Sequence, residues 1–166
     1  MQKKFQVQNR GLGAMMPLIG CMTSRVRYQV SCICEAAGYQ LTPEEADTLM
    51  LIHHCEGVPQ SQLAKMLGKD KTSVTRLMNA LVKSGLVARI QDESDRRIVR
   101  ACMTEEGKKA FTRIFPQLKT LSDKVLDGLS ESDVEMVKKV ISQMTANLAA
   151  LDDAMDEMQG EEVSSK

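Results

Sequence analysis

Charged and hydroxyl side chains share one face of a predicted helix that begins near Lys71. Arg76 carries a guanidinium that can pair with the O6 and N7 atoms of guanine, and Asn79 can pair with adenine or with the DNA backbone. The first turn of such a helix also offers unpaired N–H groups and a partial positive charge to phosphate. These features predict a helix that reads duplex DNA, and an ordinary helix with a solvated polar face is the alternative. The candidate contacts are Lys71, Thr72, Ser73, Thr75, Arg76 and Asn79.

A second set of charges lies in the segment QDESDRRIVRACM, residues 91–103. The runs LVARI and RIVRACM are β-prone and the residues between them are polar, a pattern that predicts a hairpin. Arg96 and Arg97 then lie at the tip of this hairpin, close to the predicted helix. They either contact phosphate or form exposed ion pairs with the neighbouring acids, which would contribute less than about 1 kcal/mol to stability.

Cysteine and histidine side chains raise two further hypotheses. Cys21 and Cys32 are eleven residues apart, which places them on one side of a helix, and a reactive pair would act as a redox sensor. A reactive thiol needs a neighbouring cation, which the sequence does not fix, so buried and inert cysteine is the alternative. His53, His54 and Cys55 are adjacent, and adjacent residues on a helix point about 100° apart, so a shared metal ion is not expected.

The sequence contains no nucleophile with a base at a recognisable spacing, no glycine-rich phosphate loop and no metal motif. We therefore expect neither an enzyme nor a bound cofactor. The five cysteines are an odd number without a C-x-x-C pair, which favours reduced thiols in a cytoplasm. No apolar run approaches the roughly 20 residues that span a bilayer, and the N-terminal residues do not resemble a signal peptide. No membrane partner is expected.

The charge distribution agrees with a nucleic-acid partner for the middle of the chain. The net charge of the 166 residues is zero, yet residues 61–100 contain nine Lys and Arg against four Asp and Glu. Residues 121–166 contain four Lys against eleven Asp and Glu. A basic middle and an acidic end indicate that the middle binds a polyanion. Aromatic residues make up 3% of the chain, so we expect an aliphatic, mainly helical core.

Helices are predicted before and within the DNA-binding segment. Apolar residues recur at helical spacing over about 16–37, with Pro17 near the start of that helix. Thr42 and Glu45 form a capping box for a second helix. A short helix, a glycine-containing turn and a longer helix capped by Asp70 then match the helix-turn-helix pattern.

Two further helices are predicted after the hairpin. Thr104 caps a long helix, and Ser130 with Asp133 opens the last one. The apolar residues of the last helix follow steps of four and three residues, which is the heptad pattern of a helix that packs against a partner. The residues of this row are Val137, Ile141, Met144, Leu148, Leu151 and Met155. Residues 159–166 are predicted to form a disordered tail.

The segments LAKMLG, TSVTRLMNALVKSGLV and DESDRR followed by MTEEG resemble the multiple-antibiotic-resistance regulator (MarR) family over residues 41–107. The order of the helices extends the resemblance over nearly the whole chain. It implies a mainly α fold with a small β-hairpin wing, in which a winged helix-turn-helix lobe adjoins a helical dimerisation domain. Residues 1–40 would form an N-terminal arm and the first dimerisation helix, 41–104 the DNA-binding lobe, and 105–158 the C-terminal dimerisation helices.

In this family the first and last helices of two chains interleave, so the resemblance implies a homodimer. It also implies that small molecules, often phenolic or amphipathic, bind between the lobe and the dimerisation domain and weaken DNA binding. The expected dimerisation residues are Ile19, Val26, Val137, Ile141, Met144, Leu148 and Leu151. The residues available to an effector pocket are Tyr28, His53, Phe111 and Phe115.

The resemblance also assigns a role to the hairpin. A wing arginine in this family enters the minor groove beside the recognition helix, and Arg97 matches that arginine. Asp95 would orient its guanidinium through a bidentate pair. We therefore expect a cytoplasmic, homodimeric regulator that binds a pseudo-palindromic operator and represses until an effector releases it. A thiol-based redox-sensing regulator of the same fold, and a winged-helix protein-interaction module that does not bind DNA, are the alternatives.

Overall fold

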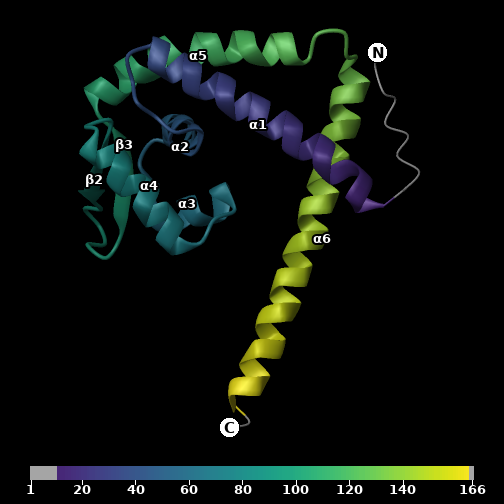
Figure 1. Ribbon diagram of the computed structural model, residues 1–166. Helices are drawn as coiled ribbons and strands as arrows, with labels where there is room; N and C mark the ends of the chain where they lie inside the picture. The colour runs from purple at the N-terminus through teal and green to yellow at the C-terminus, as the bar shows by residue number, and fades with distance from the viewer. Residues whose placement is uncertain (1–10, 165–166) are drawn as a thin grey trace. The chain divides into compact units, whose positions relative to one another are not determined.

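The computed structural model describes the backbone of residues 11–164, with side chains up to Leu151. The described residues form six helices and a three-stranded antiparallel sheet, so the predicted fold class is confirmed (Figure 1). The elements are α1 (Leu12–Ala36), α2 (Pro43–His54), β1 (Val58–Pro59), α3 (Gln60–Leu67), α4 (Lys71–Lys83), β2 (Val87–Gln91), β3 (Val99–Met103), α5 (Glu105–Val125) and α6 (Glu131–Ser164). The chain divides into two compact units, residues 1–121 and 122–166, and each is described by itself.

The core of the first unit is aliphatic and draws on five of its helices. Cys34 of α1, Ile52 of α2, Leu63 of α3, Leu81 of α4 and Ala110 of α5 are all fully buried. Burial of a leucine or isoleucine side chain contributes about 1.5–3 kcal/mol each. Because α1 and α5 bury residues in the same core as the lobe, this unit extends beyond the lobe boundaries predicted at residues 40 and 104.

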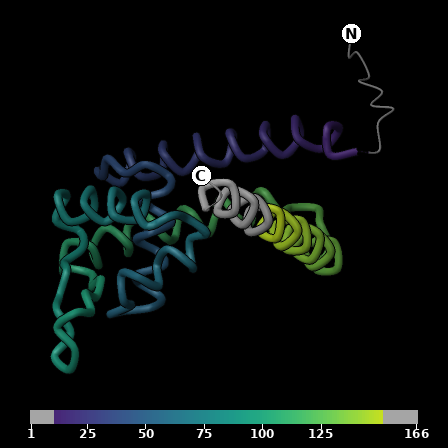
Figure 2. The backbone as a smooth tube through the Cα atoms, turned by 90° about the horizontal axis from the view of Figure 1, so that it is seen from below, coloured from purple at the N-terminus to yellow at the C-terminus, as the bar shows by residue number. Residues whose placement is uncertain are grey.

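The small sheet contains one strand that the sequence did not reveal. β2 and β3 form the predicted hairpin, with Val87 opposite Met103. β1 pairs with Ala101 and Arg100 on the other side of β3, so the strand order is β1-β3-β2. A strand of two residues has no alternation to detect, and it forms because β3 offers a free edge. The loop between β2 and β3, the wing, projects from the first unit in both views (Figures 1 and 2).

The predicted helix caps are confirmed. The Thr42 hydroxyl accepts the Glu45 N–H at 3.2 Å, and the Glu45 carboxylate accepts the Thr42 N–H at 2.8 Å. Asp70 accepts the Ser73 N–H at 2.9 Å and so fixes the start of α4. A cap of this kind contributes about 0.5–2 kcal/mol. These bonds join residues three apart, which is why the sequence reveals them.

The predicted bounds of α1 and α2 were less accurate. α1 begins at Leu12, so the predicted start near Met16 was wrong and Pro17 lies inside the helix. Proline is tolerated in a first helical turn, which is why it suggested a start, but inside a helix it removes one N–H bond. A glycine commonly ends a helix, so Gly57 predicts the end of α2 at that position, whereas α2 ends three residues earlier, at His54.

Gly107, in the first turn of α5, lies against the backbone of Leu86. A Cβ atom on residue 107 would lie 2.0 Å from the Leu86 carbonyl oxygen, which itself accepts the Thr104 N–H at 3.1 Å. We expect Gly107→Ala to lower the free energy of unfolding by about 3 kcal/mol, because backbone cannot turn away from the new methyl group. Urea denaturation measures this loss. The exposed Lys109→Ala on the same helix should cost less than about 0.5 kcal/mol, and equal losses would contradict the prediction.

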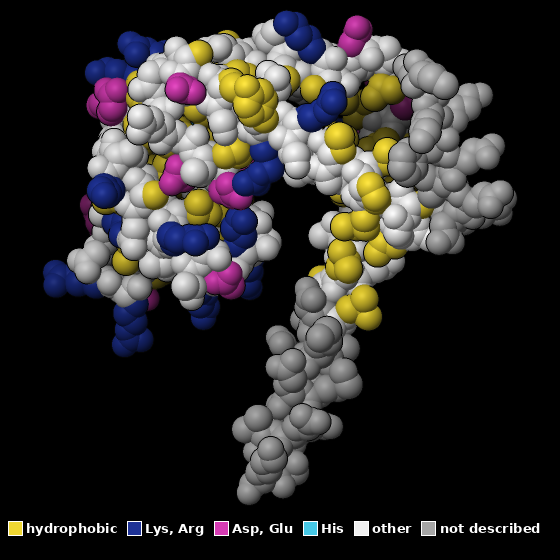
Figure 3. Space-filling model, viewed as in Figure 1, with side chains coloured by type: hydrophobic (Ala, Val, Ile, Leu, Met, Phe, Trp, Pro, Cys, Tyr) yellow, Lys and Arg dark blue, Asp and Glu magenta, His cyan; other side chains and the backbone are white. Residues whose placement is uncertain are grey.

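The second unit contains the end of α5 and the whole of α6. Ser130 and Asp133 cap α6 as predicted, since the Ser130 hydroxyl accepts the Asp133 N–H at 3.2 Å. Apolar side chains follow α6 (Figure 3), and four of the predicted row are 49–60% exposed in the single chain. These four are Val137, Ile141, Leu148 and Leu151. The helix continues to Ser164, so the tail predicted from residue 159 was wrong as far as that residue. The side chain of Met155 and residues 165–166 lie outside the described part.

Candidate nucleic-acid interface

α4 turns one face into the core of the first unit and the other toward solvent. Its buried residues, Val74, Leu77, Met78 and Leu81, follow the spacing of an amphipathic helix. Five of the six predicted contact residues line a shallow hollow on the exposed face, and Lys and Arg side chains gather at this end of the unit (Figure 3). We call this surface the α4 face, and its residues are Lys71, Thr72, Thr75, Arg76 and Asn79.

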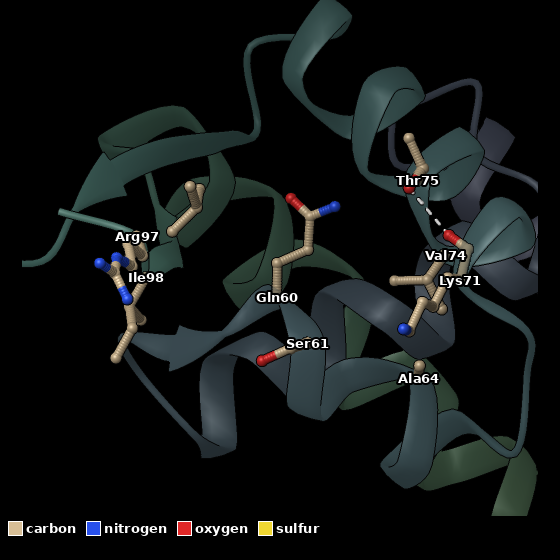
Figure 4. Close-up of a pocket in the computed structure, with 9 residues that line it drawn as sticks. Gln60, Ser61, Ala64, Lys71, Val74, Thr75, Arg97 and Ile98 are labelled. Carbon is tan, nitrogen blue, oxygen red and sulfur yellow. Dashed lines mark hydrogen bonds between the residues drawn. The ribbon is translucent and has the colours of Figure 1, made fainter. Parts of the chain in front are cut away.

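Ser73 is placed differently from the other predicted contacts. Its hydroxyl donates to Asp70 Oδ2 at 2.6 Å and its N–H donates to Asp70 Oδ1 at 2.9 Å. These two hydrogen bonds hold the pKa of the Asp70 carboxyl below its ordinary value. Ser73 therefore holds the Asp70 cap of α4 in place. Its hydroxyl oxygen can still accept one hydrogen bond. The Thr75 hydroxyl also donates within the helix, to the Lys71 carbonyl at 2.8 Å (Figure 4).

A hollow of about 330 Å³ lies between α3, α4 and the wing (Figure 4). Lys71 and Thr75 line it from α4 and Arg97 lines it from the wing, so the structure brings the predicted wing arginine and the predicted recognition helix to one surface. Gln60 and Ser61, in the first turn of α3, complete the polar lining. The sequence reveals neither residue as part of the site, because they become neighbours of Arg97 only through tertiary packing. Arg96 is exposed on the wing and is not among the lining residues.

The carboxylate of Asp95 has a different hydrogen-bond partner from the predicted one. It accepts the backbone N–H of Arg97 at 2.9 Å. Among the described residues, the carboxylate of the wing that pairs with an arginine is that of Asp92. It binds the guanidinium of Arg100 in β3, which also donates to the Gly57 carbonyl at 2.8 Å. The bidentate pair expected between Asp95 and Arg97 is therefore corrected. An aspartate in a tight turn commonly accepts the N–H two residues later, and that local bond prevails here.

The stability of the wing depends on pH through the carboxyl group of Asp92. The backbone N–H of Asp95 and the guanidinium of Arg100 donate to its carboxylate and hold its pKa below the ordinary value. The stabilisation is therefore present above the ordinary aspartate pKa of about 4 and is lost as the pH falls through the lower, folded value. We expect Arg100→Met to raise the pKa of Asp92, measured by carboxyl NMR titration. The pKa of Asp133 serves as the control and should not change, and an unchanged Asp92 would contradict the prediction.

Arg89 of β2 is a further residue that the sequence analysis missed. Its Nε–H donates to Gln60 Oε1 at 3.0 Å, and its terminal NH2 donates to Asn79 Oδ1 at 2.8 Å. One side chain thus connects the first turn of α3 to the exposed face of α4. The three residues lie 10 and 29 positions apart along the chain. No local pattern links residues at those separations.

The candidate effector residues are only partly brought together. The rings of His53 and Phe111 stack with centroids 3.6 Å apart, and those of Phe111 and Phe115 stack at 4.9 Å. Tyr28 lies outside this aromatic group and is 67% exposed. A hydrogen bond with Cys32 raises the pKa of the Tyr28 hydroxyl. His53, Phe111 and Phe115 therefore form a continuous aromatic stack between the end of α2 and α5.

The cysteines are free thiols in different surroundings. Cys21 is exposed and Cys32 is partly buried, whereas Cys34 is fully buried, which raises its pKa. No group of three or more metal-ligating side chains occurs in the part of the chain that the structure describes. Within the same described residues, no helix is both long and apolar enough to cross a membrane.

Comparison with known proteins agrees with this arrangement. The sequence profile of the MarR family matches residues 41–99, which hold α3, α4 and the wing. The fold is similar to that of the transcriptional regulator SlyA, with 25% identity over 81% of this chain and 93% of that one, and a TM-score of 0.70. It is similar to S. aureus MepR, solved as a DNA complex, with 22% identity over 79% and 94% and a TM-score of 0.70.

A third similar structure is CouR from Rhodococcus jostii RHA1, solved with p-coumaroyl-CoA. It shares 23% identity over 82% of this chain and 95% of that one, with a TM-score of 0.70. The family profile covers the helix-turn-helix and the wing, whereas the similar folds cover 79–82% of the chain. Residues 41–99 of the chain match the MarR family of DNA-binding transcriptional regulators, and the winged-helix fold of the described residues is that of solved regulators of this kind.

Proposed function

We propose that this regulator is a cytoplasmic repressor that binds a pseudo-palindromic operator as a homodimer and is released by a small molecule. The observation that carries the proposal is the composition of the two adjoining hollows. Lys71, Arg76 and Arg97 line them together with hydroxyl and amide side chains, and none of their lining residues is acidic. Such a surface attracts phosphate and can also contact base edges.

In this proposal α4 enters the major groove and the wing follows the adjacent minor groove. Arg76 and Asn79 face the bases, Lys71 and the N-terminal turn of α4 face phosphate, and Arg97 enters the minor groove. Two copies related by a two-fold axis place their α4 helices about 34 Å apart, one turn of DNA. Repression is the favoured outcome because a dimer on a promoter excludes polymerase. The S. aureus MepR–DNA complex supports this use of the fold.

The exposed apolar row of α6 supports a homodimer. Apolar side chains that are about half exposed in one chain and recur at heptad spacing are typical of a helix–helix interface. We propose that α6 and α1 supply this interface, with Met144 on the row of α6 and with Ile19 and Val26 on α1, where Val26 also packs partly against the core of its own unit. The DNA-binding role is then assigned to 41–104 and the dimerisation role to 1–40 and 105–158.

The aromatic stack supports the small-molecule part of the proposal. The stacked rings of His53, Phe111 and Phe115 form an aromatic surface against which an aromatic ligand can pack. CouR, a similar fold, binds p-coumaroyl-CoA. We therefore propose an aromatic or amphipathic small molecule as the effector class, bound at this stack and not at Tyr28.

Selection of bound duplexes from a random pool tests the proposal. The expected result is a pseudo-palindromic site whose binding constant falls with salt at a log–log slope of about −0.9 for each phosphate contact. A protein-interaction module would show no enriched duplex and no such slope. Repeating the selection with p-coumaroyl-CoA tests release. Repeating it with peroxide tests the thiol alternative through Cys21 and Cys32, which predicts loss of binding that a reductant restores.

A further inference from the structure

Arg89 holds two amide side chains at the DNA-facing surface. Its guanidinium donates from Nε to Gln60 Oε1 and from a terminal NH2 to Asn79 Oδ1, at 3.0 Å and 2.8 Å. Gln60 lies within the hollow beside Arg97 and Lys71 (Figure 4). Asn79 lies on the α4 face. We call these two hydrogen bonds of Arg89 the clamp. The clamp connects both hollows of the candidate interface.

The direction of these bonds follows from chemistry. A guanidinium carries only donors, so the amide atoms that face Arg89 must be the carbonyl oxygens. The NH2 groups of Gln60 and Asn79 consequently turn away from Arg89. Pairing with adenine needs an asparagine to present its oxygen and its NH2 side by side to the N6 and N7 atoms of one base. Because the Asn79 oxygen already accepts from Arg89 with one of its two lone pairs, it is a weaker acceptor for adenine N6–H, and the NH2 group is the free part of the amide.

We propose that Arg89 is a positioning residue for base selection, which directs the NH2 group of Asn79 outward as an N–H donor and weakens adenine-type pairing. The inference rests on the proposed function, in which α4 enters the major groove. A donor favours guanine, which offers the two acceptors O6 and N7, or thymine, which offers O4, because the single acceptor of adenine, N7, lies beside the N6–H2 donor. Gln60, held in the same way, donates to phosphate at the edge of the hollow. The expectation that Asn79 reads adenine is thereby replaced.

The clamp itself is tested without DNA. In the full-length protein, the Arg89 Nε–H should give an NMR signal that exchanges with water more slowly than that of the exposed Arg96. Gln60→Leu removes the acceptor and should bring the exchange rate of Arg89 to that of Arg96. A wild-type Arg89 signal that already exchanges as fast as Arg96 would overturn the clamp, whatever the protein does with DNA.

The effect on base selection is tested by random-pool selection with matched variants. Asn79→Ala identifies the operator position that Asn79 reads, and wild-type protein should favour guanine or thymine there. Arg89→Leu should reduce that preference by about three- to tenfold, which corresponds to the net contribution of one hydrogen bond to binding. Arg89→Lys keeps the charge but supplies one nitrogen instead of two, so it should lose the preference as well. Arg113→Leu, on α5 outside both hollows, is the control and should leave it unchanged.

The outcomes separate the clamp from the proposed function. Full retention of the preference by Arg89→Lys would show that Arg89 acts only as a cation, which overturns the proposal. An adenine preference in the wild type at the Asn79 position would also overturn it. If wild-type protein enriches no duplex at all, the proposed function fails, and the exchange measurement on the free protein still decides whether the clamp exists.

Discussion

A chain carrying Leu148→Asp should sediment as a monomer at concentrations where the parent chain is a dimer. Leu148 lies on the exposed row of α6 and is 55% exposed in the single chain. In a homodimer the variant places two carboxylates in an apolar interface. Removing a charge from water without a partner costs several kcal/mol, so the dissociation constant should rise by more than about a thousandfold. Met144→Asp, on the same row, should act in the same way.

The matched control lies two residues away. Ala146→Asp adds the same charge to α6 but falls between the members of the apolar row, on the side of the helix that faces water in a heptad. It should leave sedimentation unchanged. Operator binding should fall together with dimerisation in Leu148→Asp, because a monomer occupies only one half-site. A dimeric Leu148→Asp chain would refute the assignment of this row to the interface.

Arg76→Ala and Arg97→Ala should both weaken operator binding, but in different ways. Arg76 lies on the α4 face and is proposed to contact bases, so its loss should cost about 1–3 kcal/mol per half-site and relax base preference at one position. Arg97 lines the hollow at the wing, so its loss should weaken binding over most sequences and lower the salt slope by about one for each phosphate contact removed. Titrations on a specific and a scrambled duplex at several salt concentrations separate the two effects.

Arg113→Ala provides the charge-matched control for both variants. Arg113 is exposed on α5 and lines neither hollow of the interface. Its loss should change operator affinity only slightly, because salt screens an exposed charge that lies outside the interface. Equal losses for all three variants would mean that net charge alone governs binding. Unchanged affinity in Arg97→Ala would remove the wing from the interface.

Features decided by neighbours in sequence could be predicted here. The capping box of Thr42 and Glu45, the Asp70 cap and the Ser130 cap each join residues three positions apart, and all three are present. The spacing of Val74, Leu77 and Leu81 likewise fixed which face of α4 is buried. The exposed face that follows from it holds most of the predicted contact residues.

Local rules failed where two local preferences competed. Pro17 suggested the start of a helix, yet α1 begins at Leu12 and Pro17 lies inside it. Asp95 suggested a partner for Arg97, yet it accepts a backbone N–H in its own turn. The guanidinium that a wing carboxylate holds belongs to Arg100. In both cases the residue types were suited to two roles, and the sequence does not rank them.

The sequence by itself determined the helices, their caps, the wing and the cationic residues that the DNA-binding role requires. Tertiary structure alone decided that β1 extends the sheet, that Gln60 and Ser61 lie beside Arg97, and that Arg89 spans from α3 to α4. The physical reason is the distance along the chain. Helix periodicity and capping are set within a few residues, whereas the direction in which an amide faces depends on a donor brought to it by the packing of another element.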